Sequence, residues 1–196
     1  ALPGGDLAAK QPWRNWLAHL HQFVPQWQKI LTNTGTEPNW QILINAIDRG
    51  LNCPPISSAG RLFDAVAYDL GIAPTIVSWE GEAACHLEAL ANISSLATQA
   101  QSAVNIPVKM PLIGNKLDLA YFWQSWLNYH ASVEDKAFAF HYALAQGFAE
   151  LAANQAHKHQ CRTIVLSGGV MHNQLLRRLL KENLSEFHVL SAHKLP

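Results

Sequence analysis

The segment with the clearest chemical potential is LSGGVMHN at residues 166–173, where a Gly-Gly pair separates an apolar run from a helical pattern. Two residues without a Cβ let a ligand approach the backbone closely, and the N-terminus of the following helix attracts anions. We therefore expect Gly168 and Gly169 beside phosphate groups, and the Asn173 amide at a phosphate or sugar oxygen. The alternative is a tight turn whose glycines supply positive φ and whose Asn173 caps the helix.

Two groups of acidic residues could hold the hydroxyl groups of a sugar. Asp64 lies well inside an otherwise apolar helical pattern, too deep for the helix dipole to explain it. Its carboxylate could accept hydrogen bonds from both hydroxyls of a ribose, or it could form a local ion pair with Arg61. Gly81 and Glu82 open the next helical pattern, where Glu82 could accept a hydroxyl or only suit the helix dipole.

The histidines and cysteines predict no metal site made wholly from this chain. His19 and His21, like His157 and His159, are two residues apart, which places them about 200° apart around a helix. The three cysteines show no CxxC spacing, and their odd number argues against a disulfide framework. We therefore expect a reducing, cytoplasmic location.

The composition excludes several classes of protein. Of the 196 residues, 49% are hydrophobic and 14% are charged, so the chain can bury a core and is not a disordered segment. The 14 Lys and Arg balance 14 Asp and Glu, which leaves no long-range field to attract a nucleic-acid backbone. No apolar stretch approaches the roughly 20 residues that span a bilayer. We expect neither a nucleic acid nor a membrane as a partner.

Periodic patterns predict a helix-rich α/β fold around these residues. Residues 6–31 carry an amphipathic stripe with Pro12 in the first turn of the helix, and residues 61–70 follow two serines that could cap a helix. Residues 163–166 are typical of a strand buried on both faces, and 187–190 of a second strand, so together they predict a βαβ unit. Further helices are expected at 39–52, 82 to about 100, 121–130, 133–160 and 173–182. Gly147 lies inside the 133–160 helix, where it would permit close packing. Residues 75–79 are expected to form a short strand or an extended link.

Four blocks of sequence occur in the order in which they are found in the HypF family of carbamoyltransferases. They are LPGGD with QPWR at 2–6 and 11–14, SSAGRLFDAVA at 57–67, WEGEAA at 79–84 and LSGGVMHN at 166–173. The chain resembles the C-terminal part of HypF, which acts in [NiFe]-hydrogenase maturation. The resemblance implies part of a two-lobed, ribonuclease-H-like fold of the actin-like and sugar-kinase ATPase type.

The same resemblance implies roles for individual residues. Asp64, Gly81 and Asn173 would contact the nucleotide, and Gly168 and Gly169 would lie at its phosphates. The related tRNA-modifying enzymes have Pro-Gly-Gly where this chain has Glu80-Gly81-Glu82. This departure favours HypF; Glu82 is expected beside the nucleotide, with its role left open.

The resemblance also implies a reaction. HypF enzymes use carbamoyl phosphate and ATP to make carbamoyl adenylate in a preceding YrdC-like domain, and then transfer the carbamoyl group in the domain that this chain resembles. The acceptor is the C-terminal cysteine of HypE, and dehydration of the product leads to the cyanide ligands of the hydrogenase. A divalent metal assists in the intact domain by polarising phosphate or carbonyl oxygens.

Residues 1–196 are expected to be the C-terminal portion of that domain, truncated at both ends. The histidine metal ligands of the family would precede residue 1 and its metal-binding aspartate would follow Pro196, so the chain should carry nucleotide contacts without a complete metal centre. Alone it should have little transferase activity. Two alternatives stay open: a TobZ-like O-carbamoyltransferase of small molecules, and a non-catalytic scaffold that docks a partner through a face around Trp13, Trp16 and Trp27.

Overall fold

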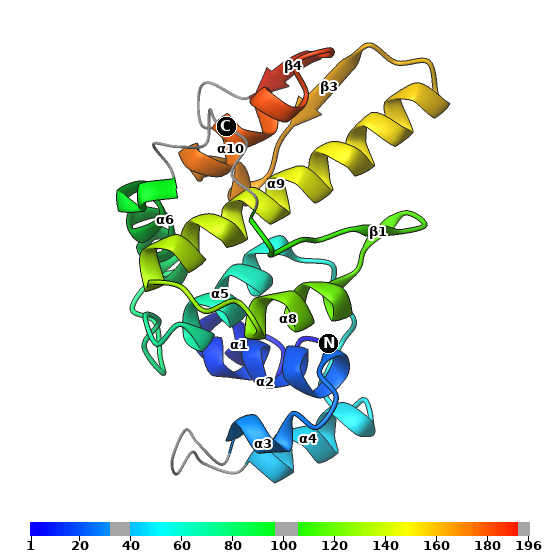
Figure 1. The fold of residues 1–196 in the computed structure, drawn as a ribbon. Helices are drawn as coiled ribbons and strands as arrows, with labels where there is room; N and C mark the ends of the chain where they lie inside the picture. The colour runs from blue at the N-terminus through cyan, green and yellow to red at the C-terminus, as the bar shows by residue number, and fades with distance from the viewer. Residues whose placement is uncertain (32–39, 97–105, 192–196) are drawn as a thin grey trace. The chain divides into compact units, whose positions relative to one another are not determined.

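The computed structural model describes residues 1–31, 40–96 and 106–191, and the chain divides into two compact units, Ala1–Leu87 and Glu88–Pro196 (Figure 1). The boundary falls within α6 (Glu82–Ile93). The first unit also contains α1 (Leu7–Lys10), α2 (Pro12–Phe23), α3 (Gln28–Leu31), α4 (Trp40–Asp48) and α5 (Ala59–Asp69). Its described residues include no strand, and residues 75–79 form an irregular link with bends at 75, 76, 78 and 79.

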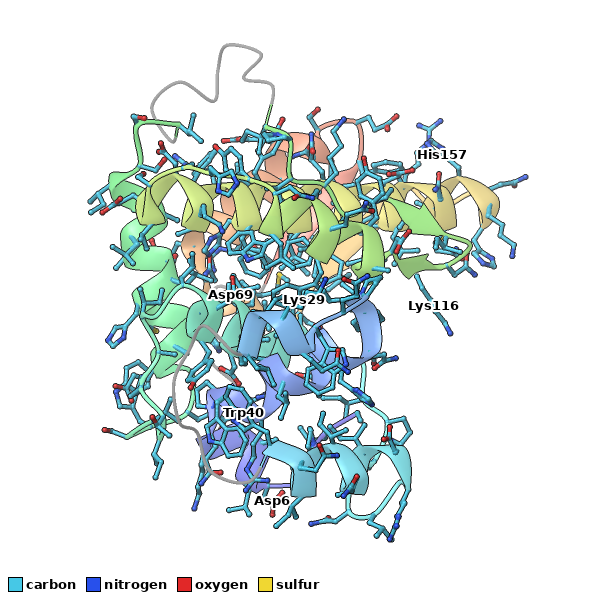
Figure 2. All side chains as sticks on the ribbon, turned by 60° about the horizontal axis from the view of Figure 1, so that its bottom comes forward. Asp6, Lys29, Trp40, Asp69, Lys116 and His157 are labelled. Atoms are coloured by element: carbon cyan, nitrogen blue, oxygen red, sulfur yellow. The ribbon has the colours of Figure 1, made fainter. Side chains whose placement is uncertain are left out.

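Helices α2 and α5 pack together in the core of the first unit. Pro12 occupies the first turn of α2 as expected, because its missing N–H is not needed there. Trp13 and Trp16 are only 6% and 3% exposed. The Trp16 indole donates a hydrogen bond to Asp69 over 2.8 Å. The same indole meets the ring of Trp40 edge-on; Asp69 and Trp40 are labelled in Figure 2. Trp13 and Trp16 are thus core residues, whereas Trp27, the third residue named for a docking face in the scaffold alternative, is partly exposed.

The second unit is built around the long helix α9 (Val133–Lys158) (Figure 1). Its other elements are the end of α6, the hairpin strands β1 (Leu112–Ile113) and β2 (Lys116–Leu117), α8 (Leu119–Leu127), β3 (Thr163–Leu166), the 3-10 helix η1 (Gly169–His172), α10 (Gln174–Asn183) and β4 (His188–Ser191). Helix α6 ends at Ile93, earlier than expected, and residues 97–100 lie outside the described part of the chain. No helix in the described ranges is long and apolar enough to cross a membrane.

Helix α9 is buried along most of its first half, where aromatic residues of α8 pack on it. The rings of Phe122 and Trp126 lie 6.0 and 6.5 Å from the ring of Phe140. Further along, a Cβ at Gly147 would lie 2.6 Å from both the Met110 carbonyl oxygen and Cδ2 of Leu117. The close packing expected of Gly147 is therefore confirmed, and it lets the β1–β2 segment approach the helix.

Strands β3 and β4 pair in parallel, and the intervening helix α10 packs along α9 (Figure 1). Thr163 pairs with His188 and Leu166 with Ser191, which confirms the βαβ unit. Val165 is 65% exposed, so the expected burial of β3 on both faces is wrong. Within the described residues, no element covers the face of the two-stranded sheet on which Val165 lies.

Candidate functional site

Asp64 lies inside α5, a helix whose start is set by its sequence. Ser58 caps it, with its Oγ accepting the Arg61 amide over 3.4 Å. Residues 62–67 are all buried, and Asp64 among them is 4% exposed. Because an isolated charge is costly in the interior, a carboxylate placed this deeply needs partners.

The partners of Asp64 are Arg61 and Asn15. Arg61 Nη1 lies 3.0 Å from Asp64 Oδ2, which is the local ion pair expected as one alternative. Asn15 Nδ2 donates to the same carboxylate oxygen over a long 3.4 Å and to the Ala8 carbonyl over 2.7 Å. The Oδ1 atom of Asn15 is buried and finds no hydrogen-bond partner within the described ranges. The cluster therefore leaves one polar atom unsatisfied, which is uncommon in a protein interior.

The environment of Asp64 changes its acidity. Burial raises the pKa of Asp64 to about 6, the Arg61 guanidinium opposes this rise, and the charge of Glu80 adds to it. A buried carboxylate of this kind is stabilised by any ligand that donates hydrogen bonds to its ionised form. The hydroxyl groups of a sugar are ligands of that type.

Gly81 and Glu82 lie at the start of α6, as expected. Gly81 has a φ of +89°, a conformation that residues with a side chain rarely adopt. Glu82 Oε2 accepts the backbone amide of Ser78 over 2.6 Å, which ties the 75–79 link to the beginning of the helix. Glu82 therefore has a structural contact of its own, whatever it contributes to a ligand.

The Gly-Gly pair connects β3 to η1 and is open to solvent. Gly168 has a φ of +98°, so the positive φ expected of a turn is present there. A Cβ at Gly168 or Gly169 would meet no described atom within 4 Å. The first amides of a 3-10 helix have no acceptor within that helix. The loop thus combines open space with backbone donors, which suits the close approach of an anion.

Asn173 caps α10, in agreement with the structural alternative for this residue. Its Oδ1 accepts the Leu176 amide over 2.8 Å, and its Nδ2 lies 3.0 Å from Nε2 of His141. The side chain is 8% exposed. The second N–H of the amide group makes no hydrogen bond within the described ranges, so capping leaves one donor for a ligand.

The sequence predictions missed His141, the partner of Asn173 in α9. The imidazole is fully buried, and burial lowers the pKa of His141 to about 4, opposed by its hydrogen bond to the Ala137 carbonyl. Ala137 belongs to the apolar stripe that predicts α9, and His141 follows it by four residues on the same face. That spacing was a usable signal, because a histidine on a core face needs a polar partner.

Glu88 was also missed, and it occupies the N-terminus of α10. Its Oε1 accepts the backbone amides of Gln174 and Leu175 over 2.7 and 3.0 Å. The anion that the helix dipole favours at this end is thus a carboxylate of the chain itself. The contact joins residues 86 positions apart, so no local pattern could predict it.

The candidate residues are divided between the two units. Asp64, Gly81 and Glu82 belong to the first unit, and Gly168, Gly169 and Asn173 to the second. The first group offers carboxylate acceptors, and the second offers backbone and amide donors. Sugar hydroxyls donate hydrogen bonds and phosphates accept them, so the first group by itself suits a sugar and the second group by itself suits a phosphate. Within the described ranges, no three His, Cys, Asp or Glu side chains are grouped so that they could hold a metal ion.

A depression of about 460 Å³ lies beside α10 in the second unit. It is lined by Asn92, Gln174, Leu175, Arg177, Arg178, Lys181 and Glu182. None of the six candidate residues lines it. The sequence predictions did not single out its cationic residues, because three basic side chains on an amphipathic helix are equally typical of a solvated face.

The whole chain, residues 1–196, matches the family described as carbamoyltransferase, Kae1-like domain, second subdomain. The carbamoyltransferase HypF of Rhodobacter capsulatus is 34% identical over 100% of this chain and 25% of its own length. A HypF homolog of Cupriavidus necator is 31% identical, over 94% of this chain and 48% of its own length. The chain therefore spans between a quarter and a half of the length of these relatives.

Two solved structures are similar in fold. The crystal structure of HypF from T. kodakarensis has a TM-score of 0.83 and 27% identity, covering 97% of this chain and 25% of that one. A full-length HypF in the phosphate- and nucleotide-bound form has a TM-score of 0.78 and 27% identity, covering 100% of this chain and 25% of its own. The expected helix-rich α/β class is confirmed, and the Kae1-like assignment implies the ribonuclease-H-like, actin-like ATPase fold. The chain belongs to the HypF carbamoyltransferase family, in which it corresponds to the second subdomain of the Kae1-like domain.

Proposed function

We propose that this chain supplies the nucleotide-binding part of a carbamoyl-transfer domain in [NiFe]-hydrogenase maturation. The observation that carries the proposal is the match of all 196 residues to the Kae1-like second subdomain of carbamoyltransferases. A full-length HypF of the same fold is nucleotide-bound, which supports ATP or its adenylate as the ligand class here. In the proposed domain organisation, residues 1–196 are the C-terminal portion of that domain.

In this proposal, different residues contact different parts of the nucleotide. Ionised Asp64 accepts hydrogen bonds from ribose hydroxyls, and these bonds replace solvation that burial has removed. The amides near Gly168 and Gly169 donate to phosphate oxygens, which the absence of a Cβ allows to come close. Gly81 lets the start of α6 lie near the ligand, and Glu82 fixes that loop through its bond to Ser78.

The bound nucleotide would deliver the carbamoyl group as carbamoyl adenylate, formed from carbamoyl phosphate and ATP. The acceptor in this proposal is the thiolate of the C-terminal cysteine of HypE, and the protein acts in the cytoplasm. A divalent metal would polarise phosphate or carbonyl oxygens in the intact domain.

A transfer assay tests this function. Residues 1–196, with and without the other HypF domains added, are incubated with labelled carbamoyl phosphate, ATP and either HypE or a HypE variant that lacks its terminal cysteine. We expect label on intact HypE alone, and we expect little transfer from residues 1–196 without further domains. Label on a small-molecule hydroxyl instead would favour an O-carbamoyltransferase of the TobZ type. Absence of both transfer and nucleotide binding in the folded protein would contradict the proposal.

A further inference from the structure

His141 is a fully buried histidine that the proposed nucleotide contacts do not themselves use. It lies in the buried half of α9, and its Nε2 lies 3.0 Å from Nδ2 of Asn173. Its other ring nitrogen, Nδ1, lies 2.8 Å from the carbonyl oxygen of Ala137, one turn earlier in the same helix. Both nitrogens are therefore engaged, and the identities of their partners determine where the ring proton lies.

The hydrogen-bond pattern has one consistent assignment. A carbonyl oxygen only accepts, so Nδ1 of His141 carries the proton and donates it to Ala137. Nε2 is then the unprotonated acceptor, so the side chain of Asn173 must present its NH2 group to it. This leaves Oδ1 of Asn173 to accept the Leu176 amide, as the 2.8 Å distance requires. Each bond in the series fixes the direction of the next.

We propose that His141 is a positioning residue that fixes the orientation of the Asn173 side-chain amide. In this orientation Asn173 can offer a ligand a hydrogen-bond donor but no acceptor. The inference rests on the proposed function, because it specifies how Asn173 would meet the nucleotide. With Oδ1 bonded to Leu176 and one N–H bonded to His141, the remaining N–H is the group left for a ligand. The ligand atom at Asn173 is therefore an acceptor, as a phosphate oxygen is, and not a hydroxyl hydrogen.

The competing explanation is that His141 only fills space in the core. A neutral imidazole is well suited to a fully buried position, and burial lowers the pKa of His141 to about 4. A space-filling role, however, requires neither a particular tautomer nor an acceptor atom at Nε2. The two explanations therefore differ in what they predict for the ring proton and for substitutions that keep or remove the acceptor.

Nitrogen NMR of the protein tests the orientation directly and needs no ligand. The parent should show His141 neutral and protonated at Nδ1. In Asn173→Asp the new carboxylate faces Nε2 and should draw a proton onto that nitrogen. A parent protonated at Nε2, or an unchanged ring in Asn173→Asp, would overturn the proposed orientation.

Calorimetric titration of ADP then tests the consequence for binding. In His141→Gln the side-chain carbonyl can still accept from Asn173, so affinity should stay within about threefold of the parent. His141→Leu has no acceptor and should bind at least about tenfold more weakly. His157→Gln serves as the matched control, because it makes the same change at an exposed site in the same helix and should bind like the parent.

The outcomes distinguish the positioning role of His141 from the proposed nucleotide-binding function. Equal affinity in the parent, His141→Gln and His141→Leu overturns the positioning role and leaves the nucleotide site intact. Failure of the folded parent to bind ADP refutes the proposed function, and the NMR result still decides the orientation of Asn173. If His141→Leu does not fold, the tautomer of the parent and the response of Asn173→Asp provide the test.

Discussion

The two units each contain a buried polar cluster, and the clusters differ in how completely they are satisfied. In the second unit, the Asn173 amide joins Leu176 and His141, with distances of 2.8 and 3.0 Å. In the first unit, Asp64 has an ion pair with Arg61 but only a 3.4 Å contact to Asn15, whose Oδ1 finds no partner within the described ranges. In the Asp64 cluster a buried polar atom therefore lacks a hydrogen-bond partner within the described ranges. In the Asn173 cluster all polar groups except one N–H are hydrogen-bonded.

This difference indicates two ways in which a buried hydrogen-bond network can contribute to a ligand site. A closed network stabilises the fold and orients a ligand group, so its removal should cost free energy of unfolding. An incomplete network retains unsatisfied polar groups that a ligand can satisfy, so its removal should cost binding more than stability.

Asn173→Ala should give the largest loss, about 2 to 4 kcal/mol in the free energy of unfolding. The change removes the α10 cap, worth about 1 kcal/mol, and leaves buried Nε2 of His141 without a donor, at about 1 to 3 kcal/mol. Urea denaturation measures the effect, with the exposed neighbour Gln174→Ala as the control. A loss below about 1 kcal/mol would mean that the second network is not closed as described.

Acidification should remove stability through His141. Its pKa is 6.5 in the unfolded chain and about 4 in the fold, so between these values the unfolded chain binds a proton that the folded chain excludes. The free energy of unfolding therefore falls as the pH drops from about 6.5 towards 4, by up to about 3 kcal/mol. His141→Gln should lose this step. His19, whose pKa burial also lowers to about 4, is present in both proteins, so identical pH profiles would contradict the prediction.

Glu88→Gln should lower the free energy of unfolding by about 1 kcal/mol. The amide oxygen can still accept from Gln174 and Leu175, but the negative charge at the N-terminus of α10 is lost. Glu182→Gln is the control, since its carboxylate is exposed and lies 3.9 Å from Arg178. Equal stability of Glu88→Gln and the parent in urea would show that the charge contributes nothing.

Asp64→Asn should change stability least, by less than about 1 kcal/mol at pH 7. The pKa of Asp64 is raised from 3.8 to about 6, so its contribution to stability is present below pH 3.8 and is lost as the pH rises through 6. The substitution removes that cost of ionisation together with the ion pair to Arg61. A loss above about 2 kcal/mol in urea would show that Asp64 serves the fold.

The sequence predicted local features well and distant contacts poorly. The Ser58 cap, Pro12 in α2, the positive φ of Gly168 and the close approach at Gly147 all follow from backbone rules that operate over a few residues. Glu88 escaped prediction because its partner lies 86 residues away, and the spacing of His141 from Ala137 indicated a core histidine without identifying its partner Asn173, 32 residues away. Tertiary packing determines which distant residues become partners, and that packing cannot be inferred from a single sequence.

The candidate site shows the same limit. Its residue types were chosen from the sequence, and the local alternatives named for Asp64 and Asn173 are both present in the structure as an ion pair and a cap. These structural contacts use only part of each side chain. What the sequence could not supply was the burial that raises the pKa of Asp64, because burial depends on how α2 and α5 pack.

The most direct test of the nucleotide site is a calorimetric titration of ATP into the protein and into Asp64→Asn, with the exposed Asp48→Asn as the control. The proposed site predicts that the parent and Asp48→Asn bind equally. It also predicts that Asp64→Asn binds at least about tenfold more weakly while its free energy of unfolding changes by less than about 1 kcal/mol, since a hydrogen bond to a charged group is worth about 1.5 to 3 kcal/mol. Equal affinity in all three proteins would contradict the assignment of Asp64 to the nucleotide.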